Sequence, residues 1–171
     1  VLDGGRLASG ACDYTIKLWD LPTGACVATI ERHEDEVYSL AVLEGGRLAS
    51  GSEDQTIKIW DVAARTCVAT LDGHEGTVWS LAVLEGGRLA SASGDFTIKI
   101  WDVSTRACVA TLEGHEDVVW CLAVLDGGRL ASGSRETTIK IWDIDSRACV
   151  ATLEGHEDEV YSLAVLEGGR L

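Results

Sequence analysis

The sequence predicts an all-β fold built from repeated four-stranded units, and three observations support that prediction. A Trp-Asp pair recurs every 41 residues, at 19–20, 60–61, 101–102 and 142–143. Within each unit apolar and polar residues alternate at a period of two, which is typical of β-strands. No stretch of useful length shows the 3.6-residue period of a helix. A fixed period of this length indicates a repeat architecture.

The unit that covers residues 31–71 predicts four strands in order. The first, 37–43 (VYSLAVL), is almost continuously apolar, as expected for a strand that is covered on both faces. A Gly-Gly turn leads into 47–52 (RLASGS), because glycine reaches positive φ without steric cost. A polar turn then precedes 56–61 (TIKIWD), and a short connection leads to 66–71 (TCVATL). These strands predict an antiparallel meander.

One such sheet has two apolar faces and cannot bury both alone, so the units must stack on one another. Twisted sheets stacked around an axis form a β-propeller. We expect residues 1–171 to form a single repeat domain. Full blades are predicted at 31–72, 73–113 and 114–154, strands two to four of a composite blade at 1–30, and its innermost strand plus a redundant hairpin at 155–171.

Composition and charge restrict the partners and the compartment. The formal net charge is −14, which repels phosphate backbones and anionic lipid, so we expect neither nucleic acid nor membrane as a partner. The sequence shows neither an apolar run of membrane-spanning length nor a leader peptide, which predicts a cytoplasmic location. Four of the six cysteines hold one repeat position, and there is no Cys-x-x-Cys pair. Free thiols in a reducing compartment are therefore expected, with no cofactor and no metal.

The recurring Gly-His pair, the LASGS strand and the TIKIWD strand resemble the WD-repeat (WD40) β-propeller family, over the whole chain and four times. The resemblance implies a hydrogen-bonded tetrad of His, Ser, Asp and Trp in each blade. The tetrads would be His33, Ser50, Asp54 and Trp60; His74, Ser91, Asp95 and Trp101; His115, Ser132, Glu136 and Trp142; and His156 with Ser9, Asp13 and Trp19. Two positions depart from the family pattern: Arg32 replaces the Gly before His33, and Glu136 replaces the turn Asp. A stretched or incomplete tetrad is predicted at Glu136.

The same residue types also occur in hydrolase triads, but this set recurs once per blade at equivalent positions, whereas a triad needs one activated nucleophile in one cleft. We therefore predict no catalytic residues. The sequence His-Glu-Asp at 33–35 supplies too few fixed ligands for a metal. Gly-Gly-Arg-Leu lacks both the spacing and the Lys of a phosphate-binding loop.

The resemblance also implies that proteins or peptides bind one face of the propeller, at positions three and five residues after each His and one before the turn acid. The fifth positions are all aromatic: Tyr38, Trp79, Trp120 and Tyr161. The third positions are Glu36, Thr77, Val118 and Glu159, and the turn positions are Cys12, Glu53, Gly94 and Arg135. Aromatic anchors beside varied polar residues are typical of interaction hot spots. The alternative is that the rings only pack the innermost strands around the channel.

Rings of this family usually hold more than four blades, so four blades predict about half a ring with two exposed apolar faces. A two-fold homodimer that closes an eight-bladed ring is the simplest closure. We therefore expect a non-enzymatic protein-interaction scaffold that self-associates through its open blade faces. The alternative is an engineered or excised repeat fragment with self-assembly as its only property. The absence of Met, the start in mid-hairpin and the seven-residue overlap between 1–7 and 165–171 favour it. The near identity of the repeats indicates recent repeat amplification or design.

Overall fold

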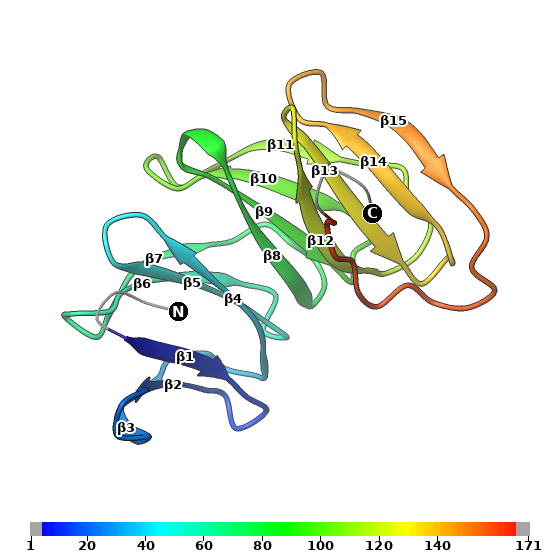
Figure 1. The fold of residues 1–171 in the computed structure, drawn as a ribbon. Coiled ribbons are helices and arrows are strands. Elements are labelled where there is room, and N and C mark those ends of the chain that lie inside the picture. Colours follow the sequence, from blue (N-terminus) through cyan, green and yellow to red (C-terminus); the bar gives the residue numbers. More distant parts are fainter. Residues whose placement is uncertain (1–4, 167–171) are drawn as a thin grey trace.

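The computed structural model describes residues 5–166, which form four antiparallel sheets (Figure 1). The first sheet contains β1 (Arg6–Gly10), β2 (Thr15–Asp20) and β3 (Ala25–Glu31). The second contains β4 (Val37–Leu43), β5 (Arg47–Ser52), β6 (Ile57–Asp61) and β7 (Thr66–Leu71). The third contains β8 (Val78–Leu84), β9 (Arg88–Ser93), β10 (Ile98–Asp102) and β11 (Ala107–Leu112), with the 3-10 turn η1 (Glu85–Gly87) between β8 and β9. The fourth contains β12 (Val119–Leu125), β13 (Arg129–Ser134), β14 (Ile139–Asp143) and β15 (Ala148–Leu153).

Each sheet is a meander in which strands that are adjacent in sequence pair antiparallel. The all-β prediction is confirmed, and in the second sheet β4, β5 and β7 have the predicted bounds. The strand β6 begins one residue late, at Ile57, because Thr56 donates its backbone N–H and its hydroxyl to Asp54. Gly45 and Gly46, with φ of 73° and 70°, make the predicted hairpin turn between β4 and β5.

Every complete sheet carries a β-bulge at the start of its first strand. In β4, Val37 pairs with Ser52 and Ser39 pairs with Gly51, so Tyr38 lies between them without a partner on β5. The same register shift recurs in β8 and β12. Because a bulge bends the strand and re-aims a side chain, it sets the direction of the aromatic residue at this position.

Neighbouring sheets pack face to face through positions that recur in every repeat. Between the second and third sheets, Ile57, Ile59 and Leu71 lie in one core cluster with Leu89 and Trp101, and each of these five is at most 2% exposed. The first strands β4, β8 and β12 also contact one another in turn, so they form the inner edge of the array. The sheets follow one another from β1–β3 at one end to β12–β15 at the other (Figure 1).

The two end sheets expose apolar side chains that the inner sheets bury. Leu153 at the end of β15 is 41% exposed, whereas Leu112 at the same repeat position is 1% exposed. At the other end Leu7 is 40% exposed, whereas its counterpart Leu89 is fully buried. The array is therefore open at both ends within the described residues.

An innermost strand was predicted within 155–171, but the structure assigns no strand to 160–165. The physical reason is pairing: in every complete sheet this strand is held by the strand that follows it, and at this end of the array no such strand follows within the described residues. The redundant hairpin predicted near residue 171, like residues 1–4, lies outside the described residues.

Candidate functional site

The structure brings together the four side chains of the first predicted tetrad across β5, β6 and two loops. His33 Nδ1 lies 2.7 Å from Asp54 Oδ2, and His33 Nε2 lies 2.6 Å from Ser50 Oγ. The indole Nε1 of Trp60 donates to the same Ser50 oxygen at 2.8 Å. The Arg32 that replaces glycine before His33 leaves these contacts intact. The four side chains therefore form one continuous chain of hydrogen bonds.

The partners fix where the protons lie. An ionised carboxylate only accepts, so the N–H of His33 is on Nδ1 and points to Asp54. Nε2 then accepts from the Ser50 hydroxyl, whose oxygen accepts from Trp60. Protonated His33 would present a second N–H to that oxygen, and Ser50 would have to redirect its own proton. The tetrad is thus built for a neutral histidine.

The electrostatics agree with a neutral histidine beside an ionised carboxylate. Burial lowers the pKa of His33 and of His115, because it disfavours the charged imidazolium. Burial alone would raise the pKa of Asp54, but hydrogen bonds from Thr56, His33 and the backbone N–H of Glu34 outweigh it and hold that pKa at about 2. Glu136 is held at about 2 by the corresponding donors. The carboxylates therefore stay charged far into the acid range.

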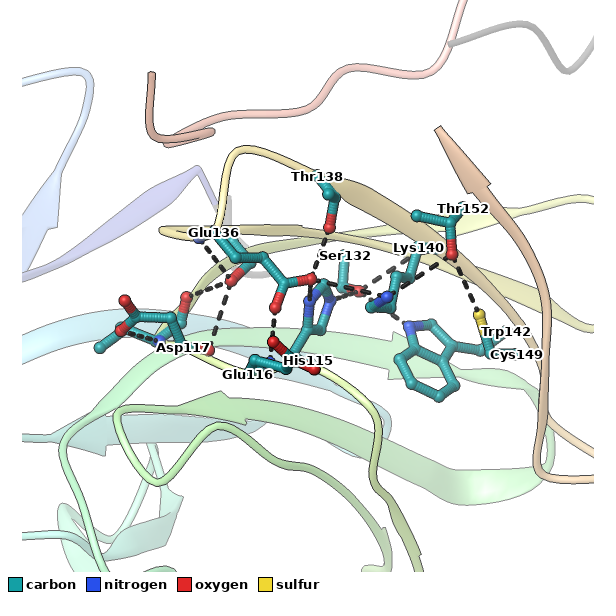
Figure 2. A network of polar contacts seen from close by, with 12 residues as sticks. His115, Glu116, Asp117, Ser132, Glu136, Thr138, Lys140, Trp142, Cys149 and Thr152 are labelled. Carbon is teal, nitrogen blue, oxygen red and sulfur yellow. Dashed lines mark hydrogen bonds and ion pairs between the residues drawn. The ribbon is translucent and has the colours of Figure 1, made fainter. Parts of the chain in front are cut away.

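The second tetrad has the same geometry, and the third is complete despite its glutamate. His74 lies 2.7 Å from both Asp95 and Ser91. In the third blade, His115 Nδ1 lies 2.8 Å from Glu136 Oε1 (Figure 2). The predicted stretching at Glu136 is therefore wrong. The extra methylene still lets the carboxylate bond Thr138 and the backbone N–H of Glu116, and Lys140 lies 3.6 Å from Oε1.

The fourth predicted tetrad is only half formed. Trp19 donates to Ser9 at 2.9 Å, and Asp13 bonds Thr15. His156 belongs to the opposite end of the array and is exposed. The structure therefore does not bring His156 to the other three residues within one chain.

The order of bonds in each tetrad is also that of a hydrolase triad: serine hydroxyl, histidine Nε2, histidine Nδ1 and carboxylate. Access decides between the two interpretations. Ser50, Ser91 and Ser132 are fully buried, and each oxygen accepts a bond from a buried tryptophan. A substrate carbonyl cannot reach these oxygens, so the tetrads join strands and loops within a blade.

The four aromatic residues predicted for the binding face lie in one continuous row. The ring centroids of Tyr38 and Trp79 are 4.4 Å apart, those of Trp79 and Trp120 are 4.6 Å apart, and those of Trp120 and Tyr161 are 5.5 Å apart. Tyr38 and Tyr161 are exposed, and the two tryptophans are half-buried. The rings both pack against one another and present a surface, so the geometry is compatible with packing and with recognition.

The polar neighbours of the row differ from blade to blade. The Tyr38 hydroxyl lies 2.6 Å from Glu36 and 2.8 Å from Glu53. The hydrogen bond to Glu36 is the main cause that raises the pKa of Tyr38. At the next blade, Gly94 and Thr77 leave Trp79 Nε1 buried without a hydrogen-bond partner within the described residues. The third blade places Val118 and Arg135 beside Trp120, and Arg135 Nε lies 3.3 Å from Glu159. Cys12 is exposed and lies near Glu36.

Several residues that support the site were missed at the sequence level. Ser52 accepts the backbone N–H of Asp54 and donates to the carbonyl of Asp35. Thr56 binds the other oxygen of Asp54. Both residues recur around the turn acid in the other complete blades. This recurrence, two residues before and two after the acid, is the signal that could have identified them.

Among residues 5–166, no group of three or more His, Cys, Asp or Glu side chains is placed to hold a metal ion. All six cysteines are free thiols, and burial raises the pKa of Cys121 to about 11. The described part of the chain contains no helix with the length and apolarity that a membrane span requires.

Comparison with known proteins matches the chain to a family model and to a curated relative. The family model described as "WD domain, G-beta repeat" matches residues 2–20, 24–61, 65–102 and 106–143, which is most of the chain. The F-box-like/WD repeat-containing protein TBL1X of Mus musculus is 46% identical over 35 residues, which are 20% of this chain and 7% of that protein. Repeats of this kind generally mediate protein–protein interaction, and the proteins that contain them are typically non-enzymatic scaffolds. The chain belongs to the WD-repeat family.

Proposed function

We propose that this chain is a non-enzymatic protein-interaction scaffold that completes its propeller by pairing with a second copy of itself. The observation that carries the proposal is the exposure at both ends of positions that the inner sheets bury against each other. Apolar burial stabilises by roughly 25 cal/mol per Å², so the uncovered end faces favour association.

The two end faces are complementary because they hold the two halves of an interface that occurs three times inside the array. We define the N-terminal end face as Leu7, Trp19 and Leu21, and the C-terminal end face as Ile139 and Leu153. The counterparts of the first set are Leu89, Trp101 and Val103, which pack against Ile57, Ile59 and Leu71. The counterparts of Ile139 and Leu153 are Ile57 and Leu71. The N-terminal end face of one copy therefore fits the C-terminal end face of another.

The polar residues are complementary in the same way. The first sheet has Ser9, Asp13 and Trp19 but no innermost strand within the described residues. The segment after β15 supplies His156 and a strand sequence that begins at Val160. A second copy placed across the open end would complete both the sheet and its tetrad. Two such junctions, related by a two-fold axis, close an eight-bladed homodimer.

The net charge of −14 argues against nucleic acid and anionic membranes as partners, and the free thiols favour a reducing compartment such as the cytoplasm.

Substitution of an end-face leucine tests the pairing. Leu153→Glu places a charge on the C-terminal end face, and sedimentation velocity should then show only monomer, because a buried unpaired carboxylate opposes the contact. Val109→Glu is the matched control, since Val109 is 39% exposed on β11 and lies on neither end face. The control should sediment like the unaltered chain. Pairing by Leu153→Glu at the unaltered affinity would refute the proposal.

A second variant separates the scaffold from the alternative in which self-assembly is the only property. Trp79→Ala interrupts the aromatic row without touching either end face. If the row recognises partners, this variant keeps its assembled mass but loses the proteins that the unaltered chain retains on an affinity column. If both versions assemble and neither retains a partner, self-assembly alone is the better description.

A further inference from the structure

No strand is assigned to residues 160–165, yet the start of this segment occupies the position that an innermost strand takes in the other repeats. Val160 donates its N–H to the carbonyl of Ser134 at 3.1 Å, and Val37 at the same repeat position donates to Ala11 at 3.2 Å. The Val160 side chain is 5% exposed. Leu163 packs on the core cluster that contains Ala131. The segment therefore holds the register of β4 before a strand pairs with it.

Glu159 connects this segment to the fourth sheet at two points. Its Oε1 lies 3.3 Å from Arg135 Nε, and its Oε2 accepts the indole N–H of Trp120 at 3.0 Å. Arg135 also lies 4.0 Å from Asp117, which orients the guanidinium. One carboxylate is thus held by a charge and by a directed hydrogen bond, directly before Val160.

No other boundary between sheets has this arrangement in the described residues. Between the second and third sheets, Thr77 holds the repeat position of Glu159 and Glu53 holds that of Arg135. Between the third and fourth sheets, the corresponding residues are Val118 and Gly94. Glu36 is the other acid at the Glu159 position, and it accepts from the Tyr38 hydroxyl instead of an arginine. Within residues 5–166, the acid–arginine pair falls only where the segment that begins at Val160 has no strand paired with it.

We propose that Glu159 is a positioning residue for the pairing of two copies: held by Arg135 and Trp120, it keeps the strand that starts at Val160 in the register that the β1 edge of a second copy needs. This inference rests on the proposed self-association. Ordering the strand beforehand removes part of the entropy cost of binding. Because the contacts of Glu159 order the strand before a second copy binds, their loss is expected to slow association.

Association kinetics test the inference. Glu159→Ala and Arg135→Gln remove the two sides of the ion pair, and Glu157→Ala is the matched control. Glu157 lies in the same segment, is exposed, and makes no side-chain hydrogen bond or ion pair within the described residues. After dilution to monomer and reconcentration, the first two variants should associate about fivefold more slowly, the upper range for an exposed pair, while Glu157→Ala stays within about twofold. Equal rates for Glu159→Ala and Glu157→Ala would overturn the inference.

Hydrogen exchange gives a readout that does not depend on assembly. In the Leu153→Glu background, Glu159→Ala should speed exchange of the Val160 amide about fivefold, because the Ser134 bond opens more often. Unchanged exchange would also overturn the inference. If the unaltered chain stays monomeric at every concentration, the proposed pairing fails, and the Val160 amide still decides whether Glu159 orders the strand.

Discussion

At the residue scale, each tetrad depends on one serine oxygen. Ser91 Oγ accepts from Trp101 at 2.8 Å and bonds His74 Nε2 at 2.7 Å, and all three side chains are buried. Loss of this hydroxyl would leave a buried donor and a buried acceptor without partners. Unpaired buried groups are costly, so the tetrad makes the fold sensitive to a small substitution.

Ser91→Ala should therefore lower the free energy of unfolding by about 2–4 kcal/mol, measured by urea denaturation. Ser104→Ala, which removes an exposed hydrogen bond to Asp102, is the control and should alter it by less than about 1 kcal/mol. A Ser91→Ala protein as stable as the control would show that the tetrad contributes nothing to stability.

The same tetrads predict acid sensitivity in two stages. Burial lowers the pKa of His33 and His115, so the unfolded chain takes up protons there first as the pH falls below about 6.5, and stability drops. Asp54 and Glu136 titrate at about 2 when folded, well below their ordinary values. Their contribution is present above the unfolded pKa values and is lost as the pH falls toward 2.

Urea midpoints measured from pH 7 to pH 3 at high salt should fall through both stages. The salt screens the repulsion within a chain of charge −14, which would otherwise change with pH as well. A midpoint that is constant or rises between pH 7 and pH 5 would contradict a neutral, buried histidine.

At the element scale, the turn after each tetrad acid requires a left-handed residue. Gln55, Phe96 and Thr137 hold this position with φ of 67°, 70° and 71°. A β-branched residue is disfavoured there, whereas asparagine adopts this conformation readily. Thr137 is therefore the least suitable of the three.

Thr137→Asn should raise the free energy of unfolding by about 1 kcal/mol, and Gln55→Asn should raise it by less. Thermal melts of the two variants beside the unaltered chain measure the difference. A larger gain from Gln55→Asn would contradict this account of the turn.

The strands were predictable because alternation at a period of two repeats without interruption, so four repeats give the same answer independently. The bulges could not be predicted, since a bulge inserts an unpaired residue without changing the composition of the strand. The outcome at Glu136 was also hidden: sequence shows the substitution, but only the geometry shows that the longer side chain still reaches His115 at 2.8 Å. No strand forms at 160–165 because the described part of the chain supplies no strand to pair with this segment, and no local sequence pattern records that.

At the scale of the whole molecule, the open ends explain most departures from repeat symmetry. Trp60, Trp101 and Trp142 are fully buried, whereas Trp19 is half-buried in the end sheet. Leu153 and Leu7, at opposite ends of the array, are likewise more exposed than their counterparts in the inner sheets. Identical sequence positions therefore differ only in whether a neighbouring sheet covers them, which is the basis for proposing a second copy as the cover.

Native mass spectrometry of the unaltered chain tests this central claim most directly. The account predicts one dominant species at twice the 18.2 kDa chain mass, because two four-sheet arrays close one ring. A chain that stays at the single-chain mass at micromolar concentration, or a dominant species of three or more copies, would contradict it.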